Sequence, residues 1–232
     1  MMAEARISSP AAMSGARLPS YSLFAALLAA AGLPIYIHAP KFYVDEYGVS
    51  LAALGAVLFG LRLLDVVQDP VFGYVSERWR AQRSRLVGLG VAVLALAMLG
   101  LFAIPPVLPP ILWFGVMLTL VFSAFSFLTI NFYAQGVIKA GAMEGAGHLR
   151  LARWRETGAL LGVCAAAVAP AVLGSMMGAP FTGFAIGFGV LAMCAWIAMR
   201  IEWSAAGAPP SAGLKIVLQD VLARRLLLIA LL

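Results

Sequence analysis

Three charged residues lie within one long apolar stretch, "FGLRLLDVVQDPVFGYVSER" at residues 59–78. They are Arg62, Asp65 and Asp69, and their formal charges sum to −1. At about 100° per residue in an α-helix, Asp65 lies about 60° around the axis from Arg62 and Asp69 only about 20° from it. Two carboxylates one helical turn apart repel each other and attract a cation. The cluster could therefore bind one proton or one monovalent cation, and either would bring it to neutrality.

The cost of these charges favours a functional site over a purely structural one. A carboxylate at the centre of a bilayer costs about 2.5–3.5 kcal/mol on insertion scales, and such residues usually mark ion or substrate pathways. The alternative is a buried ion pair, in which Arg62 bonds to one aspartate and fixes helix packing. Gly55 and Gly73 share the face of Arg62 and would let another helix approach closely. Both interpretations turn the charged face toward a bundle or a cavity.

The composition indicates that lipid surrounds most of the 232 residues. The chain is 63% hydrophobic and only 11% charged, whereas a soluble domain has about 25% charged residues. A helix that spans a bilayer needs roughly 20 apolar residues. Six segments qualify, at residues 18–39, 50–76, 86–105, 109–138, 156–178 and 180–200. The sequence therefore predicts an all-α transmembrane fold.

The charged span has recognisable ends. Ser50 is a favourable N-cap and Glu77–Arg78 marks the other end, which predicts a helix of about 27 residues, roughly 40 Å long. Arg62 and Asp65 then fall near the middle of the membrane. Pro34 predicts a kink in the first span, because proline lacks an N–H group and clashes with the preceding turn.

Lysine and arginine positions predict that the N-terminus lies in the cytoplasm. The loops on that side carry Arg6, Arg17, Arg78, Arg80, Arg83, Arg85, Lys139, Arg150, Arg153, Arg155, Arg200 and Lys215. The opposite loops carry only Lys41, beside Asp45 and Glu46. This is the positive-inside distribution of a multi-pass protein of the cytoplasmic membrane. It accounts for the net charge of +6, so we expect the lipid bilayer and not nucleic acid as a partner.

The spans divide the chain into four parts. We expect a cytoplasmic tail over 1–17, a six-helix bundle over 18–200, a central cytoplasmic loop over 201–220 and the start of a seventh helix over 221–232. The final apolar run, "LLLIALL", is too short to cross a bilayer. It indicates that a second six-helix half is missing and would be needed to complete a pathway.

The segment "RLLDVVQDPVFG" (62–73) resembles the second-helix signature R-x-x-D-x-x-x-D-P-x-x-G of the glycoside–pentoside–hexuronide:cation symporters, which belong to the major facilitator superfamily. Three other segments support this resemblance. "FYVDEYGVS" (42–50) is similar to the family's first outer loop, "GYVSERWRAQRSR" (73–85) to the superfamily's cytoplasmic loop and "RWRETGALLG" (153–162) to the entry of the fifth helix. The resemblance implies an N-terminal bundle made of two inverted three-helix repeats, one of two bundles that rock around a midplane site.

The resemblance also assigns roles to individual residues. Asp65 and Asp69 would bind the coupling ion, H⁺ or Na⁺, with Arg62 as ion-pair partner. The other assignments are Ser126 or Thr129 as a helix-four hydroxyl at the cation site, Tyr133 and Arg155 at the substrate, and Gly73, Glu77 and Arg78 at the cytoplasmic gate. Tyr36 would line the substrate cavity or belong to the aromatic belt at the interface.

The substrate-binding part departs from the family pattern. Sugar permeases of this family hold sugar hydroxyls with one acid on helix one and one on helix four, and Ala29 and Thr129 occupy those positions here. Gln68 replaces an Asn common between the aspartates. A site without two carboxylate acceptors should reject melibiose-like ligands. We therefore expect cation-coupled transport of a sugar, glycoside, uronate or related small solute, with the substrate class open.

Other functions remain as alternatives. A major-facilitator carrier of a non-sugar substrate such as a lysolipid would fit the same signature, and a non-transporting membrane scaffold would fit the composition. A membrane enzyme is disfavoured because the sequence has no H-E-x-x-H, no G-x-S-x-G and no paired acid with His on a shared face. We expect no cofactor, and no metal beyond a possible Na⁺ at Asp65 and Asp69.

Overall fold

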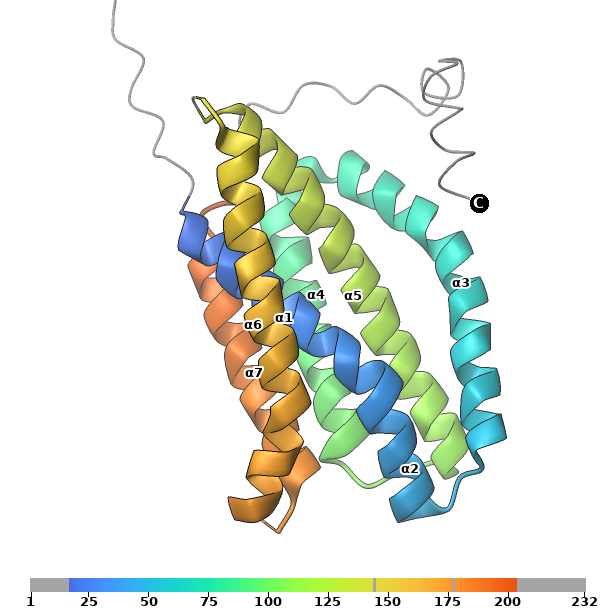
Figure 1. Cartoon of the computed structure of the whole chain (residues 1–232). Helices are drawn as coiled ribbons and strands as arrows, with labels where there is room; N and C mark the ends of the chain where they lie inside the picture. Colours follow the sequence, from blue (N-terminus) through green and yellow to red (C-terminus); the bar gives the residue numbers. More distant parts are fainter. Residues whose placement is uncertain (1–16, 144, 177, 204–232) are drawn as a thin grey trace, which may run out of the picture.

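The computed structural model describes residues 17–143, 145–176 and 178–203, and every regular element in these ranges is helical. Six helical segments are long and apolar enough to cross a membrane, and they form one bundle (Figure 1). The predicted all-α transmembrane fold is confirmed. In chain order the elements are α1 (Leu18–Leu33), a π-helical turn (Pro34–His38), α2 (Ala39–Tyr47), α3 (Leu51–Arg78), a 3₁₀ turn (Arg80–Gln82), α4 (Arg83–Phe102), α5 (Pro110–Gly141), α6 (Gly147–Met176) and α7 (Pro180–Met199).

The predicted parts outside the bundle fall mostly beyond the described residues. This holds for the tail over 1–17 except Arg17, for the loop over 201–220 except its first three residues, and for the seventh-helix start over 221–232. The described part of that loop belongs to the core. Trp203 is buried, and its ring centre lies 5.3 Å from that of Phe24 in α1.

The first span is longer than predicted, because the helix continues past Pro34. The missing N–H group is accommodated by a π-helical turn at Pro34–His38, after which α2 runs to Tyr47. Gly48, in the left-handed conformation with φ 65°, then caps the last carbonyls. Most of the segment predicted as an outer loop over 42–50 is therefore helical.

The fifth span also starts earlier than predicted, at Gly147 instead of residue 156. Its first turns hold Arg150, Arg153 and Arg155, which hydropathy alone places in a loop. Hydropathy counts the residues that lipid requires and misses helical turns that extend into water. Arg155 thus lies within a helix, two turns from its start.

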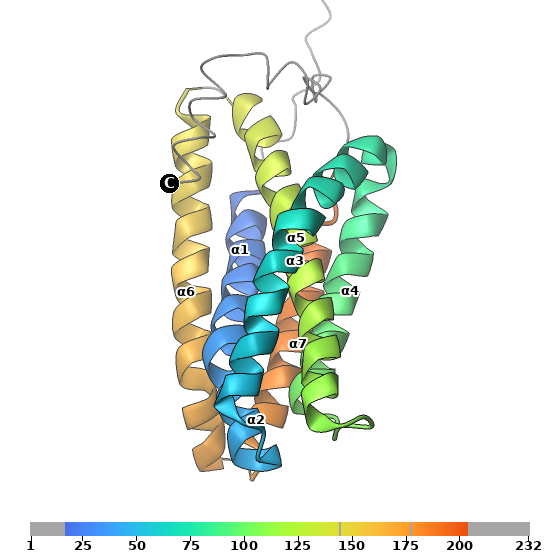
Figure 2. The ribbon, with the colours of Figure 1, turned by 90° about the vertical axis from the view of Figure 1, so that its right-hand side faces the viewer.

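Helix α3 begins and ends as predicted. The Ser50 side chain accepts a hydrogen bond from the N–H of Ala53 at 3.2 Å, and the helix has 28 residues. It packs along α5 and touches α2, while its remaining surface is uncovered by the described residues. Figure 2 shows α3 in front of α5.

The helix contacts follow an inverted repeat of two three-helix groups. Helix α1 packs along α6, and its counterpart α5 packs along α3. Helices α4 and α7 pack on each other, α4 also on α5 and α7 also on α1. Exchanging α1 with α5, α3 with α6 and α4 with α7 therefore preserves these contacts, as expected for inverted-repeat transporters. The contacts of α6 with α7 and α5 have at most weak counterparts at α3. Figure 1 shows α3 at one edge of the bundle beside α5, with α6 and α7 at the other edge.

Two glycines let α6 approach the backbone of α1. A Cβ atom at Gly158 would overlap the carbonyl oxygen of Ser22, and one at Gly162 would overlap that of Ala26. Their G-x-x-x-G spacing places both glycines on one face of α6. This close approach fixes the position of Arg155, which lies one turn before Gly158.

Buried polar side chains join the helices at the end where α1 begins and α3 ends, here called the inner end after the predicted orientation. Ser76 of α3 donates to Asn131 of α5 at 2.7 Å. Lys139 of α5 lies 3.5 Å from the buried carboxylate of Glu202, which also accepts the backbone N–H of Arg17 at 3.3 Å. These contacts therefore join the two three-helix repeats at the end of the bundle where the cytoplasmic gate is predicted.

Candidate cation and substrate site

Arg62 lies between one carboxylate and two aromatic rings. Its Nη1 atom is 3.6 Å from Oδ2 of Asp65. Its guanidinium carbon lies 5.0 Å from the ring centre of Tyr36 and 5.7 Å from that of Phe122. Both rings attract the cation through their electron-rich faces. Arg62 is 59% exposed and makes a single long contact to Asp65, so the pair is not the tight structural clamp of the alternative interpretation.

Asp65 is connected to α5 through Gln68. Oδ1 of Asp65 accepts a hydrogen bond from Nε2 of Gln68 at 2.8 Å, and Oε1 of Gln68 accepts one from Oγ of Ser123 at 2.9 Å. The Asp65 side chain is only 17% exposed. Sequence reasoning missed Ser123, although its position three residues before Ser126 places both hydroxyls on one face of α5.

Asp69 is connected to α5 directly. Its Oδ1 atom accepts a short hydrogen bond from Oγ of Ser126. The two carboxylates of α3 therefore face two hydroxyls of α5, with Gln68 between Asp65 and Ser123. A hydroxyl can donate to a carboxylate or offer its oxygen to a cation, so Ser126 suits the role that the resemblance gives a helix-four hydroxyl.

Thr129, the other candidate hydroxyl, does not bond to either aspartate. It lines a pocket of about 200 Å³ between α1, α5 and α6. Ala29 lines the same pocket, so the structure brings together the two positions where the sugar permeases carry acids. The Oγ1 atom of Thr129 is buried without a hydrogen-bond partner among the described residues.

Arg155 and Tyr133 form the polar wall of this pocket. The guanidinium carbon of Arg155 lies 4.6 Å from the ring centre of Tyr133. Its Nη2 atom is also 2.8 Å from the carboxylate of Glu156. Stacking on the ring and pairing with Glu156 hold the planar fork in one orientation, which suits recognition of acceptor oxygens on a ligand.

Tyr36 belongs to the charged cluster and not to this pocket. It comes from the π-helical turn, and its ring packs edge-on against Phe122 at 5.7 Å while lying against Arg62. Its predicted contact with substrate stays a prediction, and the contact that the structure shows is with Arg62. Phe122, which sequence reasoning missed, completes the aromatic surface on which Arg62 rests.

The two charged residues of the predicted gate differ in their contacts, and their role as a gate stays a prediction. Glu77 pairs with Arg80 at 3.3 Å, one turn further along the chain. Arg78 is exposed and makes no ion pair within the described ranges. Gly73 has open space where a Cβ would point, as does Gly55. The expected close helix approach at these glycines is not made by the described helices, because their side of α3 is uncovered.

The cation cluster and the substrate pocket share α5. Ser126 reaches Asp69 on the α3 side, and Thr129, one turn later, reaches the pocket on the α6 side. Three residues correspond to a rise of about 4.5 Å. A shift of α5 that changes one site must therefore change the other.

The comparisons with known proteins agree with this architecture. The family model described as MFS/sugar transport protein matches residues 20–232, which include every candidate site residue. No curated protein and no solved structure matches the chain.

Proposed function

Because the chain belongs to the MFS/sugar transport protein family, we propose that it is a cation-coupled secondary active transporter. It moves a sugar, glycoside, uronate or related small solute by alternating access. The family is one of transporters rather than enzymes, and the six long apolar helices make the chain a multi-pass integral membrane protein. We place it in the cytoplasmic membrane with its N-terminus inside, on the distribution of lysine and arginine.

The observation that carries the proposal is the unbalanced charge of the α3 cluster. Asp65 and Asp69 both face α5, and Arg62 is shared between Asp65 and two aromatic rings. One negative charge is left over. A coupling cation, H⁺ or Na⁺, neutralises it, so the loaded site can close without burying net charge in the membrane.

The substrate pocket supports a solute that offers acceptor oxygens. Arg155 donates hydrogen bonds and cannot accept them. The pocket has no acid at Ala29 or Thr129 to accept hydrogen bonds from sugar hydroxyls, and its one carboxylate, Glu156, is paired with Arg155. The ring of Tyr133 offers an apolar surface for a sugar face.

One six-helix bundle forms one wall of a transport pathway, and we propose that a second six-helix bundle forms the other.

The cation site can be tested by thermal unfolding of the purified chain in detergent. Sodium chloride and choline chloride at equal concentration, each at several pH values, would separate Na⁺ from H⁺. We expect the coupling ion to raise the unfolding temperature of the parent chain, and this shift to disappear in Asp65→Asn and Asp69→Asn. Asp45→Asn is the matched control, because Asp45 pairs with Lys41 at 2.6 Å outside the site.

Transport itself is tested with a protein that carries both six-helix bundles, in vesicles under an imposed pH or Na⁺ gradient. Solute accumulation should depend on the gradient and be lost in both site variants. If Asp65→Asn and Asp69→Asn both kept gradient-driven accumulation, the assignment of the ion site would be wrong.

A further inference from the structure

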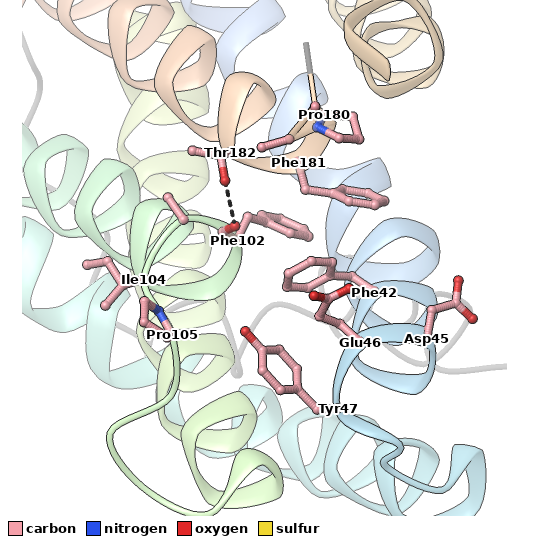
Figure 3. Close-up of a pocket in the computed structure, with 13 residues that line it drawn as sticks. Phe42, Asp45, Glu46, Tyr47, Phe102, Ile104, Pro105, Pro180, Phe181 and Thr182 are labelled. Atoms are coloured by element: carbon pink, nitrogen blue, oxygen red, sulfur yellow. Dashed lines mark hydrogen bonds between the residues drawn. The ribbon is translucent and has the colours of Figure 1, made fainter. Parts of the chain in front are cut away.

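A second cavity, of about 440 Å³, lies at the outer end of the bundle, remote from the α3 cluster. It is enclosed by the end of α2, the end of α4 and the start of α7 (Figure 3). The side chains that line it include aromatic rings, two carboxylates and a hydroxyl, from Phe42, Asp45, Glu46, Tyr47, Phe102, Phe181 and Thr182.

Four aromatic rings meet at this cavity from three helices. The ring centre of Phe42 lies 5.0 Å from that of Phe181 and 5.7 Å from that of Tyr47. Phe102 stacks on Phe181 with centres 5.7 Å apart and planes 11° from parallel. Aromatic rings grouped around a space are the typical environment for a quaternary ammonium group.

Two adjacent carboxylates lie at the cavity: Asp45 is paired with a lysine, and Glu46 has no partner among the described residues. Asp45 pairs with Lys41 at 2.6 Å, and Figure 3 shows its carboxylate pointing away from the cavity. Glu46 makes no hydrogen bond or ion pair with the described residues, and its carboxylate lies between Phe42 and Tyr47 on the cavity side. Since Lys41 is committed to Asp45, the charge of Glu46 is not compensated locally.

The C-terminal ends of two helices add partial negative charge to that of Glu46 at the cavity. Helices α2 and α4 both end here, at Tyr47 and Phe102, so the negative ends of their dipoles lie at the cavity, although the N–H groups of Gly48 and Val49 cap carbonyls at the end of α2. The carbonyl of Phe102 accepts a hydrogen bond from Thr182 at 3.4 Å. The start of α7 has the opposite polarity, but Pro180 provides no N–H group there. The cavity is therefore suited to a cation and not to an anion.

We propose that this outer cavity binds a methylated ammonium group, either of a free solute or of a choline-type lipid headgroup. The rings of Phe42, Tyr47 and Phe181 contact the methyl groups, and Glu46 supplies the counter-charge. The site is separate from the cation cluster of α3, so the proposal does not depend on the proposed transport function.

The test is titration of the purified chain with tetramethylammonium chloride in maltoside detergent, followed by calorimetry, with potassium chloride at equal ionic strength as reference. We expect saturable binding. Glu46→Gln should weaken it about tenfold, and Phe181→Leu, which keeps an apolar side chain, should weaken it severalfold through loss of the ring face. Asp45→Asn is the matched control and should change it less than about twofold, because that charge is already paired.

The source of the ammonium group is found by repeating the titration in nanodiscs of phosphatidylcholine and of phosphatidylethanolamine, which have the same net charge and differ in methylation of the ammonium group. Weaker binding of the probe in phosphatidylcholine would show that the lipid headgroup occupies the cavity, and equal binding would assign the site to a free solute. Either result supports the site. Absence of saturable binding in detergent, or equal losses in Glu46→Gln and Asp45→Asn, would overturn it.

Discussion

The contact between α1 and α6 gives the sharpest prediction, through Gly158→Ala. The added methyl group would overlap the backbone carbonyl of Ser22, which cannot rotate away as a side chain could. Overpacking of this kind costs about 1–3 kcal/mol, while alanine recovers up to about 1 kcal/mol of helix propensity. Because the overlap is with backbone, the upper end of that range applies, and the net loss is about 2 kcal/mol. For a chain of this size it corresponds to an unfolding temperature lowered by about 4–8 °C.

The matched control is Gly174→Ala in the same helix. A Cβ at Gly174 would lie 3.7 Å from the nearest atom, the Cβ of Pro180, which is ordinary contact. This variant keeps the gain in helix propensity without the overlap, so its unfolding temperature should be equal to the parent's or slightly higher. The assay is thermal unfolding of each purified variant in the same detergent. Equal temperatures for Gly158→Ala and Gly174→Ala would refute the close packing of α6 on α1.

The same substitution should also weaken solute binding. Arg155 lies one turn before Gly158, and its guanidinium is held over Tyr133 on α5 at 4.6 Å. If α6 moves away from α1, the pocket of about 200 Å³ widens and Arg155 leaves its position. Gly162→Ala combined with Gly158→Ala should cost less than the sum of the two, since one displacement of α6 relieves both overlaps.

Three further predictions concern the two sites and the inner end. Ser126→Ala should change the cation dependence of unfolding and leave solute affinity near its parent value, while Thr129→Ala should do the reverse; both are measured by unfolding with cation and with solute. Arg155→Lys should weaken solute binding about tenfold, because an ammonium group lacks the planar fork that stacks on the Tyr133 ring, and calorimetry measures the loss. Lys139→Met leaves the buried carboxylate of Glu202 without its cation and should cost about 1–3 kcal/mol. Adding Glu202→Gln should recover part of that loss in a double-mutant cycle of unfolding temperatures.

The helices of the membrane core could be predicted because lipid imposes a length and a composition on them. Their extensions into water could not. The first turns of α6, with Arg150 and Arg153, satisfy no lipid requirement, and neither do the last turns of α2. Hydropathy therefore placed both in loops. The start of α3 was predicted correctly because Ser50 carries a capping signal that does not depend on lipid.

The candidate site was predictable on α3 and only partly on α5. The spacing of Arg62, Asp65 and Asp69 within one helix fixes their common face without knowledge of any neighbour. The choice between Ser126 and Thr129 depends on how α5 is turned and shifted against α3, and that register is set by packing. The contact between Arg62 and the ring of Tyr36 was not predicted, for a similar reason. Tyr36 reaches Arg62 only through the π-helical turn.

The geometry of α5 suggests how the two sites could be coupled. In the structure Ser126 donates its hydrogen to Asp69, and its oxygen keeps lone pairs that can bind a metal cation, whose arrival at the two residues would shift this hydrogen bond. Protonation of Asp69 would likewise change the hydrogen bond that Ser126 donates to its carboxylate. Either event alters the contact that holds α5 against α3, and Thr129 and Tyr133 follow on the same rigid helix. The guanidinium of Arg155 lies over the ring of Tyr133. A change in the charge of Asp69 would therefore displace residues of the proposed substrate pocket through movement of α5 alone, without a change in the fold.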